Sequence, residues 1–486
     1  MSEIFQPGVP HAGCALALMA LVVALTGCGG GDANGVAGSL PDGSPLTLVR
    51  SDTNEIPDSV TIPEYKTLRA TVTSVTGGVV PDATVQAALA ADNHHLAVTQ
   101  LNAVLVAQSG ADGQTANPVV VPPLTYAVLR SLGAAASGAS LDEISASFKL
   151  SASMFEAALQ TDRIISEWWA DRGRRFRTGF LAANDALGLW TRWADWSAAE
   201  TGFADGSASG DAALTQSFAA ASPDLSLNNF SALTDIRLLA THSLAATGVW
   251  GAVTPFDGIF ERSGPQDLLR LPLLRLTTGV RRHSGADFNV DMLAIGELGG
   301  LRLMNLRPTT GTLTDFTAAR LEPALAEAIQ ALAAGAGTPI AGEMVLPAMD
   351  ITLPLQADAS LRRAGVNLVY DEVNANLKNL DGVGGTYVQS ASPAARLRIA
   401  ADGLALRAAH AMAFTFSPLN IHGPNYSSGV DSSTSSFHAY PDSCSWPSVD
   451  LRSFFLVLLD SHNRVVSLLA MQSPPGVEVA PDCSPY

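Results

Sequence analysis

The chain has 486 residues, 47% of them hydrophobic and 15% charged, with a formal net charge of −17. Such a chain can bury a substantial core, and its length fits two to four domains or one large domain with a tail. The acidic balance excludes nucleic acid as a partner, because no basic patch is present to neutralise phosphates.

The N-terminus has the pattern of a bacterial lipoprotein signal peptide. An apolar run, Ala15–Leu25, is too short to span a bilayer comfortably, and Thr26, Gly27 and Cys28 follow it. We expect residues 1–27 to be removed and Cys28 to carry a lipid, which anchors the protein outside the cytoplasm, at the bacterial outer membrane or cell surface. An uncleaved anchor is the alternative. The first 14 residues lack Lys and Arg, so the translation start stays open.

The next segments predict a tether followed by helices. Residues 28–81 are rich in Gly, Ser, Pro, Asp and Thr, which is typical of a flexible linker. Helical spacing of apolar residues predicts a helix over Val85–Gln108, and Asn117–Leu129 predicts a strand, then a helix. Ser140 and Glu143 have the spacing of a capping box at the start of another helix. The Trp-rich range 168–196 favours core packing over a ligand platform.

Strands predominate from Asp235 onward. Alternating or apolar runs predict strands at Leu238–Trp250, Asp287–Ile295, Leu301–Leu306, Gly342–Leu346, Ala348–Leu353, Phe454–Leu459 and Val465–Ala470. Helices are predicted among them at Leu321–Ala334 and Ala359–Ala364. Helices that come first and strands that follow predict one α+β domain over residues 82–475 rather than a βαβ array.

The segment Leu397–Leu419 has the clearest strand pattern. Asp402-Gly403 predicts a tight turn, and the side chains alternate after it. One face carries Leu404, Leu406, Ala408, His410, Met412 and Phe414, and the other carries mostly alanine. A long polar stretch follows Ser417-Pro418. Such a segment is either an ordinary edge strand or an exposed bait for a partner.

The remaining polar residues indicate no catalytic or metal site. Cys444 and Cys483 predict one disulfide in an oxidising compartment, which would staple the C-terminal tail, residues 476–486. His94 and His95 are adjacent on a predicted helix and point apart, so no metal is expected. We expect no cofactor and no enzyme activity, since neither a phosphate loop nor a nucleophile elbow is present.

Several stretches in the first half resemble the serpin family. Gly138-Ala-Ser-Leu-Asp-Glu-Ile144 is similar to the family's Gly-Ala-x-Gly-x-Thr-x-x-x-Ile, and Asn117…Pro123-Leu-Thr is similar to its Asn…Ser-Pro-Leu-Ser. His242-Ser-Leu-Ala-Ala-Thr-Gly-Val-Trp250 resembles its Asn-Ala-x-Tyr-Phe-Lys-Gly-x-Trp.

The second half continues the resemblance in the same order. Leu346-Pro-Ala-Met-Asp-Ile-Thr and Leu361-Arg-Arg-Ala-Gly365 resemble the family's Leu-Pro-Lys-Phe and Leu-Gly-Ile stretch. Ser453-Phe-Phe-Leu, followed by Asp460, is similar to Pro-Phe-Leu-Phe…Asp. The resemblance covers roughly residues 85–475. It implies an α+β fold with an N-terminal helical region, a large mixed or antiparallel central sheet and an exposed reactive-centre loop.

The resemblance also implies a mechanism. A serine or cysteine endopeptidase cuts the loop, and the loop then inserts into the sheet as a new strand and carries the trapped enzyme with it. Asp402, Gly403 and Leu404 stand at the hinge. Counting from Gly403 places the cleaved bond at Phe416-Ser417, where Phe416 suits a chymotrypsin-like pocket. We expect a monomer that touches the membrane only through its lipid.

The hinge departs from the family pattern, which leaves two functions open. Leu406 and Arg407 stand where the family has alanines, and the stretch 420–450 is longer than in the family. The alternative to an inhibitor is a non-inhibitory serpin-fold binding module at the cell surface. Trapping requires a vacancy in the sheet and a free strand that can fill it.

Overall fold

The computed structural model describes residues 83–108, 117–148, 164–171, 190–194, 238–262, 268–295, 300–333, 343–353, 357–382, 385–416 and 451–478, together with short pieces at 38–39, 45–46, 176–177, 180 and 355. Within the predicted tether it places a small ladder of β1 (Gly38–Ser39) and β2 (Pro45–Leu46). Residues 1–27, Cys28, Cys444 and Cys483 lie outside the described part.

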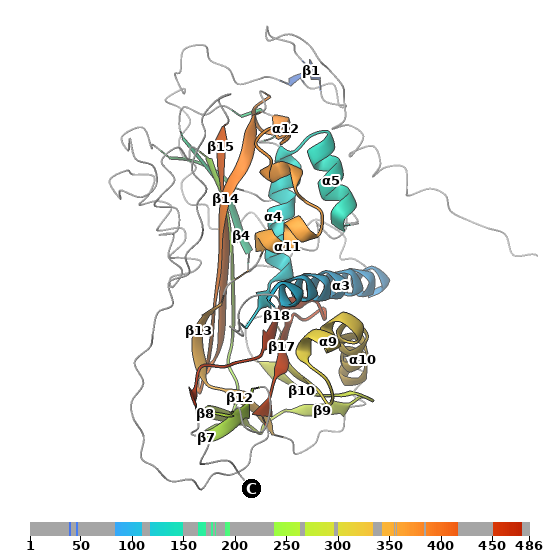
Figure 1. Ribbon diagram of the computed structural model, residues 1–486, viewed down its shortest axis with the longest axis vertical. Helices are drawn as coiled ribbons and strands as arrows, with labels where there is room; N and C mark the ends of the chain where they lie inside the picture. Colours follow the sequence, from blue (N-terminus) through green and yellow to red (C-terminus); the bar gives the residue numbers. More distant parts are fainter. Residues whose placement is uncertain are drawn as a thin grey trace, which may run out of the picture.

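Three sheets form the body of the molecule (Figure 1). The main sheet has the order β13-β14-β15-β6-β4-β5. Its strands are β4 (Ile164–Asp171), β5 (Trp190–Ala194), β6 (Leu238–Gly248), β13 (Met349–Leu353), β14 (Thr386–Ala400) and β15 (Gly403–Phe416). All of its neighbouring strands are antiparallel except the β4–β5 pair, which is parallel.

The two other sheets pack at one end of the main sheet. The second sheet, in the order β3-β18-β17-β11-β10-β9, contains β3 (Val119–Val120), β9 (Arg281–Ser284), β10 (Phe288–Ile295), β11 (Leu301–Pro308), β17 (Phe454–Leu459) and β18 (Val465–Met471). The third, β12-β8-β7-β16 with β19 on β8, contains β7 (Val253–Glu261), β8 (Leu268–Leu276), β12 (Met344–Pro347), β16 (Leu451–Arg452) and β19 (Val477–Glu478).

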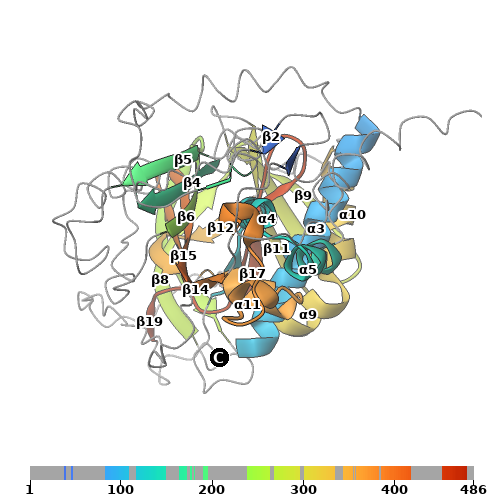
Figure 2. The ribbon, with the colours of Figure 1, turned by 90° about the horizontal axis from the view of Figure 1, so that it is seen from above.

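Helices cover one side of these sheets (Figures 1 and 2). They are α3 (Ala83–Gln108), α4 (Pro122–Ala135), α5 (Ala139–Phe148), α9 (Leu313–Ala319), α10 (Leu321–Ala333), α11 (Ala357–Arg363) and α12 (Lys378–Asp381), with the short 3-10 turn η2 (Leu368–Tyr370). None of the helices in the described residues is long and apolar enough to cross a membrane.

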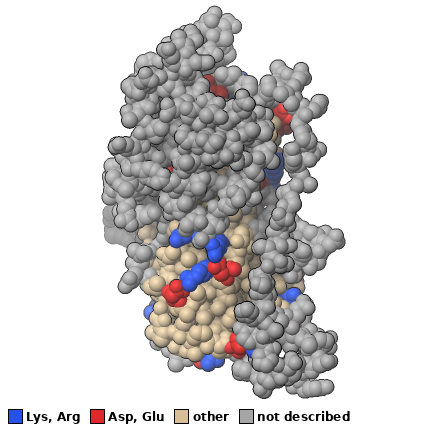
Figure 3. Space-filling view, turned by 90° about the vertical axis from the view of Figure 1, so that its left-hand side faces the viewer, with Lys and Arg blue, Asp and Glu red and all other residues tan. Residues whose placement is uncertain are grey.

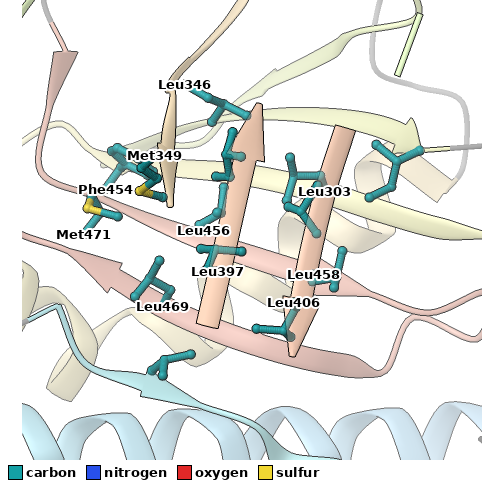
Figure 4. Close-up of a cluster of buried hydrophobic side chains, with 14 of the residues drawn as sticks. Leu303, Leu346, Met349, Leu397, Leu406, Phe454, Leu456, Leu458, Leu469 and Met471 are labelled. Carbon is teal, nitrogen blue, oxygen red and sulfur yellow. The ribbon is translucent and has the colours of Figure 1, made fainter. Parts of the chain in front are cut away.

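The buried side chains form three clusters that join the layers. Figure 4 shows the first, where Leu397 of β14 and Leu406 of β15 lie over Leu456, Leu458 and Leu469 of the second sheet. A second cluster lies between the second sheet and helices α3, α9 and α10, and a third lies between the other half of the main sheet and α4. The main sheet therefore has one face that packs against two different neighbours along its length.

Periodicity predicted the element types well, and the structure corrects several details. The α+β class, the first helix and the strands around Leu238, Phe288 and Phe454 are confirmed. The capping box is wrong. Ser140 lies inside α5, and Glu143 instead accepts hydrogen bonds from the backbone N–H groups of residues 367 and 368. The prolines before Leu124 begin α4, because proline at the first helical positions removes no intrahelical bond.

Candidate functional site

The candidate site is β15, the strand that follows the Asp402-Gly403 turn. β15 pairs with β14 from Gly403↔Ala400 to Phe416↔Thr386. Its other edge pairs with β6 from Leu404↔Gly248 to Phe414↔Leu238. The segment is therefore a central strand, hydrogen-bonded on both edges in the uncleaved chain.

The two faces of β15 divide as the alternation predicted. Leu404, Leu406, His410, Met412 and Phe414 are each 3% exposed or less. The opposite face carries Arg407, which is half-buried, and alanines, of which Ala409, Ala411 and Ala413 are also buried. The expectation that Leu404 and Leu406 face the interior is confirmed.

The turn at the hinge is held by three contacts. The Trp250 indole N–H donates a hydrogen bond to the Ala400 carbonyl at 3.1 Å. Arg398 pairs with Asp402 at 2.9 Å, and this hydrogen-bonded guanidinium lowers the pKa of the Asp402 carboxyl. Gly403 has a φ of +148°, and a Cβ there would lie 2.3 Å from the Gly248 carbonyl oxygen. Only glycine fits this position without a shift of the backbone.

The outer face near the hinge carries mixed charge. Figure 3 shows basic and acidic side chains interspersed on the side of the molecule where β13 and β14 lie in Figure 1. Arg396 makes a bidentate pair with Asp350 at 2.7 and 2.8 Å, which lowers the pKa of Asp350. Arg407 lies directly opposite Arg396 in the ladder. Seating of β15 thus brings two like charges together, a small unfavourable term.

A polar group lies in the middle of the buried face. His410 of β15 is directly opposite His242 of β6, and their ring centroids are 6.5 Å apart. His242 Nδ1 lies 3.0 Å from the Ser166 hydroxyl oxygen, and His410 Nε2 lies 3.3 Å from Asp358 Oδ1. Both imidazoles are fully buried. Burial, with His410 and Arg130 nearby, holds the pKa of His242 well below its usual value.

The carboxylate of Asp358, on α11, lies beside the buried imidazole of His410. Burial by itself would raise the pKa of Asp358, but His410, the Tyr370 hydroxyl and Arg362 together bring it below the usual value. The Tyr370 hydroxyl donates to Asp358 Oδ1 at 2.7 Å. Within the described part of the chain, no group of three or more His, Cys, Asp or Glu could hold a metal ion.

The predicted cleavage site lies at the end of β15 that is farthest from the hinge. Phe416 is the last residue of β15, and Ser417 lies outside the described residues. The 14 residues of the strand separate Phe416 from the hinge by about 45 Å at ordinary strand rise. The expectation of an exposed reactive-centre loop is wrong for Ala413–Phe416 in this conformation. Ala413–Phe416 already pairs with β14, because the alternating face is buried by strand insertion rather than left in solvent.

Sequence reasoning missed the partners of this strand. Asp358 was placed in no site, because only the fold brings α11 to the centre of β15. Most of β14 was also missed, since Thr386–Leu397 contains Pro393 and a bulge between Val388 and Ser390. Nothing in the sequence indicated that His242 and His410 lie side by side in the sheet, since 168 positions separate them along the chain.

Comparison with solved structures identifies the fold. Cleaved Serpin 42Da matches with a TM-score of 0.58 and 13% identity over 79% of this chain and 99% of that one. A loop-inserted, cleaved ovalbumin mutant has a TM-score of 0.58 and 13% identity over 79% and 100%. The thermophilic serpin tengpin in its latent state has a TM-score of 0.58 and 11% identity over 82% and 99%.

The protein has the serpin fold. No family model and no curated protein matches the sequence. At these identities the likeness concerns the fold, so the activity has to be argued from the strand itself. The serpin fold accounts for the helices beside large antiparallel sheets, and it covers about four fifths of the chain.

Proposed function

We propose that the protein is an endopeptidase inhibitor of the serine type, or of the cysteine type, that acts as a suicide substrate by inserting its loop. The observation that carries the proposal is the fit of Gly403–Phe416. These residues form a complete central strand of the main sheet, and the strand ends at the residue predicted to precede the cleaved bond. A protease bound to Phe416 would travel from the hinge end of the sheet to its opposite end.

Insertion would release free energy in two ways. Burial of Leu404, Leu406, Met412 and Phe414 contributes roughly 1.5–3 kcal/mol for each side chain, as an upper bound. Two hydrogen-bonded ladders form at the same time, one with β14 and one with β6. This release would drive the strand into the sheet faster than the acyl-enzyme hydrolyses.

The mechanism requires a second conformation. The described conformation has β15 in place without cleavage, so it has no vacancy and cannot trap an enzyme. An inhibitor must therefore exist first with β15 withdrawn and its reactive bond exposed. In this proposal the conformation described here would be the end state, and the neighbours described as cleaved, loop-inserted or latent support that reading.

The alternative is a non-inhibitory serpin-fold binding module at the cell surface. Two observations favour it: β15 is bonded on both edges in the uncleaved chain, and Leu406 and Arg407 replace the small residues of the hinge. In this alternative β15 is a permanent strand. An ovalbumin mutant and emu ovalbumin are also among the structural neighbours.

Chymotrypsin tests the proposal directly, because Phe416 suits its primary pocket. The chain from residue 29 onward is mixed with chymotrypsin and run on a denaturing gel, with Phe416→Ala as the control. A complex that survives denaturation and disappears in the control supports the inhibitor. Cleavage without complex, and without a gain in thermal stability, supports the binding module. Loss of hydrolase activity after a single Ser→Ala change would reveal an enzyme instead.

The location and tail of the protein belong to the same proposal. A lipid on Cys28 would hold the inhibitor at the outer membrane or cell surface, and a Cys444–Cys483 disulfide would staple residues 476–486 to the long loop. Mass spectrometry of the membrane fraction checks both. A Cys28→Ser variant that stays in the membrane fraction would contradict the anchor.

A further inference from the structure

His410 differs in kind from the other side chains on its face of β15, which are apolar. It is the one ionisable side chain on the buried face of the strand, and it is 0% exposed. Leu404, Leu406 and Ala408 on one side of it belong to the first core cluster. Met412 and Phe414 on the other side belong to the third. The imidazole therefore lies where the two apolar regions of the strand meet.

We propose that His410 is a positioning residue that fixes the depth to which β15 enters the main sheet, through its contact with Asp358. The inference deepens the proposed function, in which the strand must enter a slot and stop at the correct register. Asp358 lies on α11, which follows β13 and precedes β14 along the chain. It therefore belongs to the framework that receives the strand.

The groups around His410 can contact its imidazole in only one register of β15 against its neighbouring strands. Asp358 Oδ1 lies 3.3 Å from His410 Nε2, and the Tyr370 hydroxyl orients that carboxylate. His242 faces the imidazole from β6, and Arg130 of α4 and Arg362 of α11 are the nearby cations. No other residue of this face of β15 could pair with a carboxylate.

A shifted strand would lose this contact. A slip of one residue turns Arg407 and the alanines of the opposite face toward the core, and it turns the leucines, Met412 and Phe414 away from it. A slip of two residues keeps the same face inward but moves His410 by about 6.8 Å along the strand. An apolar side chain would then face Asp358, and a buried imidazole would lie among leucines without its carboxylate. The Asp402-Gly403 turn fixes the register at the hinge end of β15. Leucine and alanine on this face could tolerate a slip farther along the strand, and there His410 supplies the discrimination.

A swap variant tests the register. His410→Met combined with Met412→His exchanges two buried side chains on the same face and preserves composition. We expect hydrogen exchange of the β15 amides to accelerate at least tenfold, while β17 and β18 change little. Wild-type protection in the swap variant would overturn the proposal. A variant that fails to fold also supports it, provided that Met412→Leu, the matched control at the same depth, folds normally.

A double-mutant cycle tests the partner. His410→Leu, Asp358→Asn and their combination are compared by urea unfolding of the whole chain. We expect the unfolding constants to deviate from additivity about tenfold, which is about 1.4 kcal/mol.

Met412, on the same face of β15, provides the control for this cycle. Met412→Leu combined with Asp358→Asn should be additive, because Met412 cannot pair with the carboxylate. Additivity of the His410 cycle would overturn the proposal. A coupled cycle in a protein that forms no complex with chymotrypsin would keep the depth-setting role and refute inhibition. An additive cycle in a protein that does form the complex would do the opposite.

Discussion

Gly403→Ala is the sharpest test of whether β15 lies beside β6. The residue combines a φ of +148° with a close approach, since a Cβ would lie 2.3 Å from the Gly248 carbonyl oxygen and 3.3 Å from Val249 Cα. These are backbone atoms, so no side-chain rotation relieves the contact. An unfavourable φ costs roughly 1–3 kcal/mol, and forcing an extra methyl into packed backbone costs roughly 1–3 kcal/mol more. We therefore expect the variant to lose roughly 2–6 kcal/mol of stability.

A second glycine separates strain from crowding. Gly311 has a φ of +78°, but nothing lies within 4 Å of a Cβ built on it. Gly311→Ala should therefore lose only about 1–2 kcal/mol, the cost of the backbone conformation alone. Urea unfolding of the soluble chain measures both losses. Equal losses would refute the seating of Gly403 against Gly248.

The same variant informs the mechanism. Crowding at Gly403 destabilises β15 in the sheet and leaves a withdrawn strand unaffected, so the withdrawn form should become more populated. We expect Gly403→Ala to be cut after Phe416 by chymotrypsin faster than Gly311→Ala. Equal rates of cutting would indicate that β15 does not leave the sheet, as the binding-module alternative requires.

Three further predictions concern the same strand. Stability should fall by up to about 1.4 kcal/mol per pH unit below about pH 6.5, because His242 has a lowered pKa and the unfolded chain binds the extra proton. Urea unfolding of His242→Asn should show a flatter dependence of stability on pH. An unchanged pH dependence would contradict the role given to His242. Leu406→Ala should cost about 2–5 kcal/mol, whereas Arg407→Ala on the outer face should change stability by less than about 0.5 kcal/mol. Similar urea midpoints for the two variants would contradict this assignment of the faces. Trp250→Phe, which removes the donor to the Ala400 carbonyl, should cost about 1–3 kcal/mol and speed hydrogen exchange at the turn, and no change there would exclude the anchor.

The sequence by itself determined the local character of this protein. The alternation after Gly403 indicated which side chains of the strand share a face, since a period of two assigns them to opposite faces. It did not indicate that the alanine face is buried as well, at Ala409, Ala411 and Ala413. The Asp402-Gly403 pair located the turn, and it lies where the structure has it. Helices α3 and α10 also followed from the spacing of apolar residues.

Only the tertiary structure decided where that strand goes. An alternating segment satisfies its own pattern equally well as a loop, an edge strand or a central strand, because periodicity says nothing about the neighbours. The choice depends on whether β6 and β14 leave room, and residues far apart in the chain set that room. The meeting of His410 with Asp358 has the same origin: packing of α11 against the main sheet creates it, and no local pattern encodes it.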